Sequence, residues 1–315
     1  LIPEAEVIAL CDVYMDKCEA LKKSYSLNAN CYTDHKEMLE KEDIDIVAVA
    51  TSDKAHAKST IDALKAGCHV VCEKPMSLFV EECEEMVKTA DETGKLLMVG
   101  QVCRYAPGFV KAKSLVEKGV IGDLYFVESE YAHDYALRTG EGDWRKSPDR
   151  HGMIGGGCHA VDFIRWIAGD PYEIMAYGTH KLLPTVTYDD STIAIMKFPN
   201  NVAGKVYVST GCKRDYTMRT VIYGTKGTII CDNTSPTMQL FVADETGKAP
   251  ETPEIIELEV NNHNFIKEFE VFGDAITKGI PVPTPVEEGA KTVAACLAIV
   301  ESANTGKIVK PDYNF

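Results

Sequence analysis

The chain has 315 residues, a length that favours two domains with separate hydrophobic cores. Its formal net charge of -15 opposes binding to nucleic acid or to an anionic membrane, and no basic run interrupts that charge. The apolar runs are shorter than the roughly 20 residues of a membrane-spanning helix. The 11 cysteines form no C-x-x-C pair, which predicts free thiols in a reducing cytoplasm and no metal site.

Apolar strands alternate with amphipathic helices up to residue 100. The expected strands are residues 7–12, 46–50, 69–72 and 96–100, and the expected helices are residues 15–25, 54–66 and 78–93. This alternation indicates a parallel sheet. Asp12 ends the first strand, where a dinucleotide-binding fold holds the cofactor ribose about 20 residues after a glycine-rich turn.

No such turn precedes Asp12 in this sequence, so we expect a missing segment of roughly 20 to 30 residues before Leu1. That segment would hold the first strand, the phosphate-binding turn and the first helix. Because the first strand lies in the middle of such a sheet, its absence should split the sheet and leave backbone groups unpaired. We therefore expect the chain as given to fold poorly.

The order of expected helices and strands changes after Gln101. Helices are expected at residues 107–118, 159–168, 262–277 and 286–303, and strands at 123–135, 173–180, 192–198, 203–209, 219–223 and 227–231. Hairpin signals near residues 199–201 and 224–227 predict a largely antiparallel sheet. The expected architecture is an N-terminally incomplete α/β Rossmann domain at residues 1–101, followed by an α+β domain at residues 102–315 with an open sheet. The last helix is a candidate to pack back towards the first domain.

Two motifs suggest chemistry. Glu-Lys-Pro at residues 73–75 follows an expected strand, and Gly-Gly-Gly-Cys-His at residues 155–159 opens an expected helix. Histidine titrates near neutrality and can both accept and return a proton, so His159 is the candidate acid/base. Lys74 would lie where ligands of open α/β sheets bind and could polarise the reacting oxygen. The structural alternatives are a helix-starting histidine and a salt-bridged lysine.

The chain resembles the Gfo/Idh/MocA family, the group of glucose-fructose oxidoreductase, inositol dehydrogenase and the rhizopine-catabolism proteins. The resemblance covers essentially the whole chain and is carried by residues 10–13, 45–51, 66–75, Gln101, Arg104, Tyr105, Pro107, Trp144, Arg145, 157–159, Asp162 and 301–307. It implies an NAD-dependent oxidoreductase that acts on a secondary alcohol of a sugar, cyclitol or glycoside. Rival hypotheses are a glycosidase that uses NAD for transient oxidation and elimination, and a non-catalytic sugar or dinucleotide sensor.

The resemblance also implies which residues bind the cofactor. These are Asp12, Thr51, Ser52, His56, Glu73, Lys74, Gln101 and Arg104. A carboxylate at Asp12 would repel a 2'-phosphate, so NAD is expected in preference to NADP. The alternatives are a helix cap for Asp12, a cap or surface histidine for His56, and a structural role for Arg104.

Substrate contacts are expected at Lys74, Tyr135, Trp144, Arg145 and His159. Tyr131, His133, Tyr135 and Arg138 follow one another near the end of an expected strand, and polar aromatic side chains on one face suit carbohydrate recognition. A half-exposed strand is an equal alternative for them, because tyrosine is common in strands. Trp144 and Arg145 have structural alternatives as well.

Gly155 departs from the family pattern, since many of the related dehydrogenases carry aspartate at this place. Either Lys74 and His159 suffice, or Asp143 or Asp162 substitutes, or the substrate differs, or hydride chemistry is lost. We favour the first, because both principal proton-transfer groups remain, and expect Asp162 to brace the helix or orient the imidazole. The resemblance further suggests a homodimer or homotetramer, formed through the open sheet.

Overall fold

The structure is a computed structural model that describes residues 2, 4–136, 143–261 and 263–315. Its chain forms two compact units. The first runs up to Gly100 and includes Ile266–Ala290 and Phe315, and the second comprises Gln101–Phe265 and Lys291–Asn314. The sequence places residues 266–290 in the second domain, whereas the structure groups them with the first. Among the described residues, no helix combines the length and apolarity needed to span a membrane.

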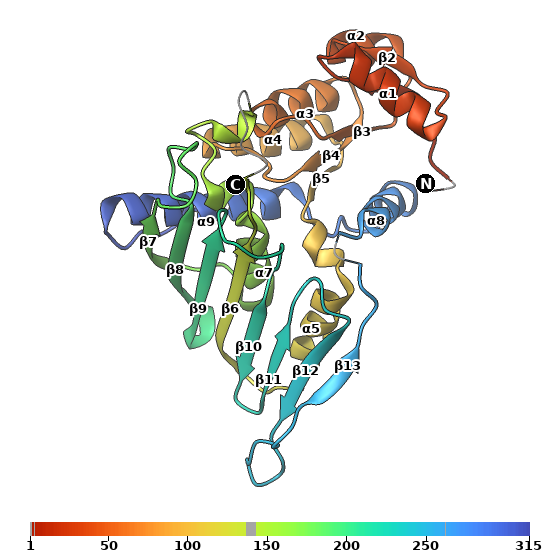
Figure 1. The fold of residues 1–315 in the computed structure, drawn as a ribbon. Coiled ribbons are helices and arrows are strands. Elements are labelled where there is room, and N and C mark those ends of the chain that lie inside the picture. The colour runs from red at the N-terminus through yellow and green to blue at the C-terminus, as the bar shows by residue number, and fades with distance from the viewer. Residues whose placement is uncertain (1, 3, 137–142, 262) are drawn as a thin grey trace. The chain divides into compact units, whose positions relative to one another are not determined.

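The first unit contains parallel strands that alternate with helices, as the sequence predicts (Figure 1). The strands are β1 (Ala9–Cys11), β2 (Asn30–Tyr32), β3 (Ile46–Val49), β4 (His69–Glu73) and β5 (Leu97–Gly100). The helices are α1 (Met15–Tyr25), α2 (His35–Lys41), α3 (His56–Lys65) and α4 (Val80–Thr93). The sequence pattern missed β2 and α2, because a three-residue strand and a seven-residue helix are too short to show a period.

These strands form two sheets rather than one. β1 pairs with β2, and a separate sheet has the order β3-β4-β5. The split falls between β1 and β3, where the sequence predicts it. β3 is correspondingly more exposed than the fully buried β5, and Ile46 has an exposed fraction of 36%.

Residues 266–290 join the first unit because they cover its larger sheet. Phe272 on α8 (Phe265–Lys278) packs with Val71 of β4 and Met98 of β5, and four partly buried apolar side chains surround this core. The backbone amide of Val99 donates to the Thr284 carbonyl at 3.2 Å. Such contacts between segments nearly 200 positions apart leave no periodic signal in the sequence.

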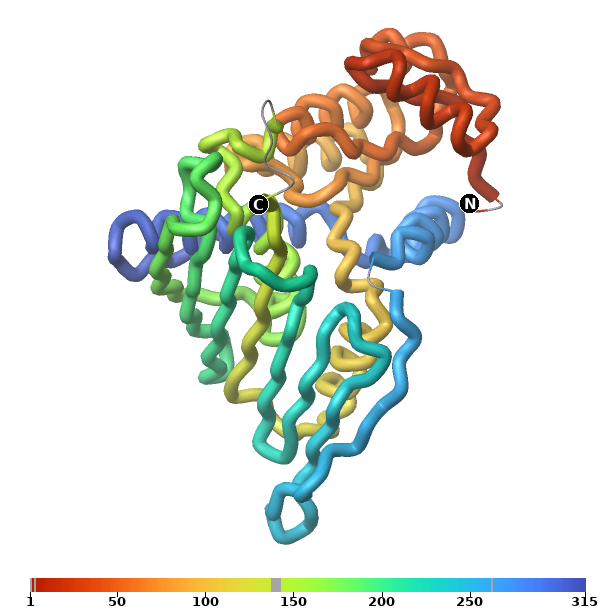
Figure 2. Tube along the Cα trace, in the orientation of Figure 1, coloured from red at the N-terminus to blue at the C-terminus, as the bar shows by residue number. Residues whose placement is uncertain are grey.

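The second unit is built on an eight-stranded sheet (Figures 1 and 2). Its order is β13 (Glu254–Glu257), β12 (Thr237–Val242), β11 (Gly227–Cys231), β10 (Thr220–Gly224), β6 (Leu124–Ala132), β9 (Val202–Ser209), β8 (Ser191–Phe198) and β7 (Glu173–Thr179). Only β6 and β9 pair in parallel; every other neighbouring pair among these strands is antiparallel. The predicted, largely antiparallel open sheet is confirmed.

Helices cover one face of this sheet. They are α5 (Pro107–Glu117) and α7 (Cys158–Ala168), preceded by the short α6 (Gly152–Gly155), and the long α9 (Val286–Thr305) follows later in the chain (Figure 1). Along β8, Ala194 and Met196 are buried while Ile193 and Ile195 are exposed. The alternation shows that one face is covered and that apolar side chains occupy the other.

Glu268 places a carboxyl group in the interior of the first unit. It lies on α8 with an exposed fraction of 1%, and its Oε1 has no hydrogen-bond partner among the described residues. Burial disfavours the charged form, and the nearby Glu73 carboxylate adds to the effect, so the pKa of Glu268 rises from 4.5 to about 8. Glu268 therefore holds a proton at neutral pH.

This raised pKa predicts a pH-dependent stability. Because the folded state binds more protons than the unfolded state, Glu268 should lower the free energy of unfolding by about 1.4 kcal/mol for each pH unit above 4.5, until pH passes about 8. Glu268→Gln should remove this slope, so the variant gains stability over the wild type as pH rises. Urea titrations between pH 5 and 9 measure the difference.

Glu270→Gln is the matched control, because Glu270 lies exposed on the same helix. Its stability should follow that of the wild type at every pH. Parallel pH profiles for the wild type and Glu268→Gln would contradict a protonated Glu268.

Candidate active site

Lys74 lies at the carboxyl end of β4, where the other parallel strands of its sheet also end. Glu73 is the last residue of the strand, and its Oε2 accepts the backbone amide of Lys74 at 3.2 Å. Lys74 is half-buried, and Pro75 is buried after a cis peptide bond. The motif thus presents the ammonium group at the sheet edge that open α/β folds use for ligands.

His56 ties two loops together at this edge. Its Nδ1 lies 2.8 Å from the Pro75 carbonyl and its Nε2 lies 3.2 Å from the Thr51 carbonyl. Burial alone would lower the pKa of His56, but the Cys72 side chain, the Pro75 carbonyl and Asp53 outweigh burial and raise it to about 9. A ring with an acceptor at each nitrogen carries two protons.

The expected role of His56 as a cofactor ligand therefore needs correction. Both ring nitrogens bind the protein's own backbone, and the exposed fraction of the residue is only 1%. The histidine is not a surface residue; it ends the 3-10 turn of Asp53–Ala55 as its C-cap and is the first residue of α3. It instead joins the loop after β3 to the Lys74-Pro75 turn, so the positions of both depend on it.

The other expected cofactor residues of the first unit are accessible. Asp12 follows β1 directly and is half-buried, and its Oδ1 accepts the Tyr14 backbone amide at 2.9 Å. Tyr14, not Asp12, is the N-cap of α1. Thr51 is exposed and Ser52 is half-buried, just before the 3-10 turn of Asp53–Ala55. The carboxylate and the two hydroxyl groups stand at the ends of β1 and β3.

Gln101 and Arg104 open the second unit and differ in their contacts. Gln101 is buried, and its Oε1 lacks a hydrogen-bond partner among the described residues. Arg104, in the 3-10 turn of Val102–Tyr105, donates from Nε and Nη2 to the two carboxylate oxygens of Asp162 at 2.8 and 2.7 Å. Arg104 was expected to bind the cofactor, but its guanidinium forms a bidentate pair inside the protein.

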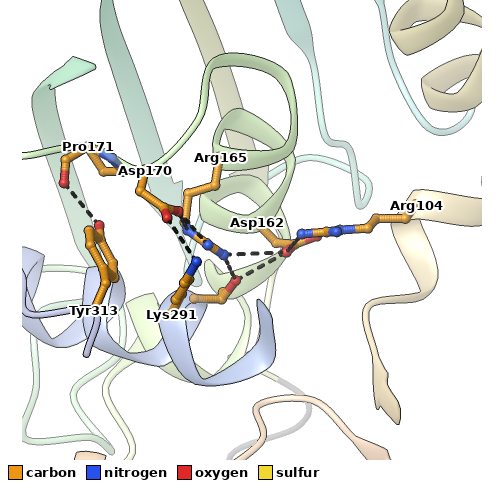
Figure 3. A network of polar contacts seen from close by, with 8 residues as sticks. Arg104, Asp162, Arg165, Asp170, Pro171, Lys291 and Tyr313 are labelled. Atoms are coloured by element: carbon orange, nitrogen blue, oxygen red, sulfur yellow. Dashed lines mark hydrogen bonds and ion pairs between the residues drawn. The ribbon is translucent and has the colours of Figure 1, made fainter. Parts of the chain in front are cut away.

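Asp162 is the centre of a buried polar network (Figure 3). Its Oδ1 also accepts the hydroxyl of Thr292 at 3.1 Å, and that hydroxyl accepts Nη1 of Arg165 at 2.7 Å. Arg165 in turn donates to Asp170 from Nε at 2.9 Å and from Nη2 at 2.5 Å. The network joins the turn of Arg104 to α7 and α9, as Figure 3 shows. Asp162 thus braces the helix that carries His159.

His159 lies in the first turn of α7 and is buried, with an exposed fraction of 2%. Its Nδ1 is 3.4 Å from Sγ of Cys103. Its ring stacks 6.1 Å from the Tyr131 ring and 5.8 Å from the His263 ring. The thiol and the second imidazole were not predicted, because they lie 56 residues before and 104 residues after His159.

Polar aromatic side chains gather around His159. The Tyr131 hydroxyl is 2.8 Å from that of Tyr135 and 3.2 Å from Nδ1 of His133. The ring of Tyr216, another residue not predicted, stacks 4.9 Å from that of His133, and its hydroxyl lies 3.3 Å from Nε2 of His263. Tyr131, His133 and Tyr135 therefore do gather, as the sequence suggests. Arg138 lies outside the described residues.

Three glycines allow these side chains to approach α7. A Cβ on Gly155 would lie 2.1 Å from Cζ of Arg150, and one on Gly156 would lie 2.6 Å from Cε1 of Tyr131. A Cβ on Gly157 would lie 2.6 Å from a methyl group of Val208. The buried Arg150 guanidinium thus fills the space that a side chain at position 155 would need.

Both acids that the sequence suggests as substitutes for an aspartate at position 155 are bound to arginine residues. Asp143 accepts the Arg145 backbone amide at 2.8 Å and pairs with the Arg145 guanidinium at 3.3 Å, and Asp162 binds Arg104. Trp144 has an exposed fraction of 39%, and the guanidinium groups of Arg145 and Arg150 lie 4.4 and 4.9 Å from its ring centroid. Trp144 thus presents a partly exposed ring held by two cations.

Two family models match this chain, one in its N-terminal part and one in the part that forms most of the eight-stranded sheet. Residues 2–101 match the model of an oxidoreductase family with an NAD-binding Rossmann fold, and residues 109–230 match the GFO/IDH/MocA C-terminal domain. The chain belongs to the Gfo/Idh/MocA family. Its first unit is an NAD-binding Rossmann domain, and NAD is the cofactor of this fold.

Curated relatives and solved structures extend this assignment. The inositol 2-dehydrogenase of Salmonella typhimurium is 25% identical over 98% of this chain and 91% of its own length. The D-glucoside 3-dehydrogenase of Escherichia coli is 28% identical over 62% of this chain and 60% of its own length. A levoglucosan dehydrogenase in complex with NADH is 22% identical with a TM-score of 0.89, covering 98% of this chain and 90% of that one. At that identity the structural likeness shows the fold.

The Asp162 network predicts a large stability effect for a small substitution. Asp162→Asn keeps the size of the side chain but leaves the buried Arg104 guanidinium without its carboxylate, which should lower the free energy of unfolding by about 3–5 kcal/mol. Asp215→Asn is the matched control at an exposed position of the same unit and should have little effect. Urea denaturation of both variants provides the measurement. A loss below about 1 kcal/mol for Asp162→Asn would show that the network does not brace α7.

Proposed function

We propose that this protein is an NAD-dependent dehydrogenase of a cyclic secondary alcohol, with an inositol or a glycoside as its substrate. The observation that carries the proposal is the setting of His159, a buried histidine stacked against Tyr131 and His263, which in turn contact Tyr216. Inositol and glucoside dehydrogenases among the relatives support this class of substrate. Bound NAD supplies the hydride acceptor.

His159 acts as the acid/base of the proposed reaction. An alcohol becomes a carbonyl group only when the hydroxyl proton leaves together with the hydride, and an imidazole takes up that proton near neutral pH. Sγ of Cys103 lies 3.4 Å from Nδ1, and a ring that carries its own proton on Nδ1, directed at the sulfur, leaves the lone pair of Nε2 free to accept the substrate proton. The contact with Cys103 and the stacked Tyr131 ring orient the imidazole.

Lys74 supplies positive charge to the same reaction. Its ammonium group stabilises the negative charge that develops on the substrate oxygen as the proton leaves. His56 holds the Lys74-Pro75 turn through the Pro75 carbonyl, at 2.8 Å, which keeps the lysine at a fixed place on the sheet edge. A fixed cation stabilises developing charge better than a mobile one.

The residues present fit NAD. The carboxylate of Asp12, at the end of β1, suits the two ribose hydroxyls and opposes a 2'-phosphate, so NAD is preferred over NADP. Thr51, Ser52 and Glu73 would contribute further polar contacts. The buried Oε1 of Gln101, without a partner among the described residues, is an acceptor that a donor on the cofactor would satisfy. Arg104 and His56 are left out of this set, because their donors bind the protein itself.

Carbohydrate recognition is assigned to the polar aromatic side chains. The hydroxyl groups of Tyr131 and Tyr135 and the ring nitrogens of His133 can exchange hydrogen bonds with substrate hydroxyls. Trp144 and Arg145 would contribute a partly exposed ring and a cation. With Arg150 beside Gly155 and both nearby acids paired, we favour Lys74 and His159 as sufficient for proton transfer.

The open face of the second unit's sheet supports a homodimer or homotetramer. Tyr177, Ile193 and Ile195 have exposed fractions of 64%, 40% and 58% on that sheet. Exposed apolar side chains gathered on one face are typical of surfaces that another protein copy covers. We place the protein in the cytoplasm, where its 11 free cysteines would stay reduced.

Absorbance of NADH tests the proposal. Inositols and glycosides are added with NAD to the wild type, which should form NADH with at least one of them. His159→Ala should lower kcat by about 10²–10⁴-fold through loss of proton transfer. Lys74→Met should lower kcat by about 10²–10³-fold through loss of charge stabilisation.

Two substitutions outside the site serve as matched controls. His180 is exposed and Lys88 lies on the surface of α4, so His180→Ala and Lys88→Met should retain kcat. NADH fluorescence confirms that each variant still binds cofactor. Wild-type turnover that is unchanged in His159→Ala would refute the assigned role, and cofactor binding with no turnover of any substrate would favour a sensor.

A further inference from the structure

One sulfur and two imidazole nitrogens that can bind a metal ion lie close together in the second unit. Cys103 comes from the 3-10 turn after the first residue of the unit, His159 from α7, and His263 from the segment before α8. One ligand atom from each residue lies within 4.8 Å of the other two. Cys103 and His159 are buried and His263 is half-buried. The sequence predicts no metal site because these residues are far apart in the chain.

The distances fit a small tetrahedral cation. In a zinc site with bonds of about 2.3 Å to sulfur and about 2.0–2.1 Å to nitrogen, neighbouring ligand atoms lie about 3.3–3.6 Å apart. Sγ of Cys103 and Nδ1 of His159 are already 3.4 Å apart. The remaining separations, within 4.8 Å, close by about 1 Å when the ring of His263 turns.

The donor types select soft cations over hard ones. A thiolate and two imidazoles suit Zn²⁺, whereas Mg²⁺ and Ca²⁺ require oxygen ligands. Sδ of Met218 lies 3.6 Å from Sγ of Cys103 and adds a second sulfur to the surroundings. Within the described residues, the cluster itself contains no carboxylate.

Neighbouring contacts hold two of the three ligands in place. Arg104, next to Cys103, is bound to Asp162, which lies one helical turn after His159. The same ion pair therefore fixes the segments of the thiol and the first imidazole relative to each other. The third ligand, His263, has a Tyr216 hydroxyl 3.3 Å from its Nε2. Ligands that are held by outer contacts lose less freedom when they bind a metal.

We propose that Cys103, His159 and His263 form a binding site for Zn²⁺, and that the bound ion withdraws His159 from proton transfer. The second part rests on the proposed function. On binding, the thiol of Cys103 releases its proton to solvent, and a lone pair of each imidazole is taken by the metal. Zn²⁺ would thus act as a reversible inhibitor that competes with the reaction for the same imidazole.

Titration with Co²⁺ tests the binding site without reference to activity. Co²⁺ replaces Zn²⁺ in such sites and gives thiolate-to-metal absorption in the near ultraviolet. The wild type should show this absorption with one equivalent per chain, and Zn²⁺ but not Mg²⁺ should displace it. Cys103→Ser should abolish the band, and His263→Ala should weaken binding by about 10-fold or more.

Cys212→Ser is the matched control, because Cys212 is a partly buried thiol of the same unit outside the cluster. Its Co²⁺ spectrum should equal that of the wild type. Thermal unfolding of each variant shows whether it is folded, and His263→Ala keeps the test decisive if Cys103→Ser does not fold. A band that survives in Cys103→Ser, a Co²⁺ affinity in His263→Ala equal to that of the wild type, or no band in the wild type would overturn the site.

Inhibition is measured separately, on a substrate that turns over. Zn²⁺ should suppress NADH formation over the same concentration range in which it displaces Co²⁺. Full activity with the site occupied would overturn the inhibitory role and leave the site itself intact. If no substrate is turned over, the proposed function fails while the spectroscopic result still decides the site.

Discussion

The buried carboxylate of Asp162 is the interaction on which the second unit depends. It binds the Arg104 guanidinium through both oxygens and reaches Arg165 through the Thr292 hydroxyl. Removal of several charges from water costs several kcal/mol per ion, so the network contributes little net stability, but the loss of one partner is severe. The network instead fixes Cys103 and His159 relative to each other, because these residues lie on the two segments that it joins.

A second constraint concerns space rather than charge. The three glycines at residues 155–157 let Arg150, Tyr131 and Val208 approach the start of α7, and a Cβ at any of them would overlap a neighbour. In the first unit, the loops at the sheet edge are held in place by the His56 ring, which lies between two backbone carbonyl groups. In both units, residues that do not themselves react determine where the proposed catalytic side chains lie.

Local patterns predicted much of this structure, and long-range contacts account for what they missed. The bounds of α1 and the alternation that forms β3, β4 and β5 follow from periodicity, and the glycines before His159 mark its helix. The strand β2 has three residues, too few to show a period, and the strands β12 and β13 were also not predicted. The partners Cys103, Tyr216 and His263 are brought to His159 only by the fold, as is Asp162 to Arg104. No spacing in the sequence could indicate these pairs.

In the proposed reaction, hydride passes from a substrate carbon to NAD while His159 takes the hydroxyl proton. The most direct test uses a substrate deuterated at the reacting carbon, followed by mass spectrometry of the NADH formed. We predict one deuterium atom in each NADH, with one ketone formed per NADH. Release of the substituent with no net NADH would contradict this mechanism and indicate transient oxidation followed by elimination, and deuterium that appears in the solvent would show that the hydrogen does not leave as hydride.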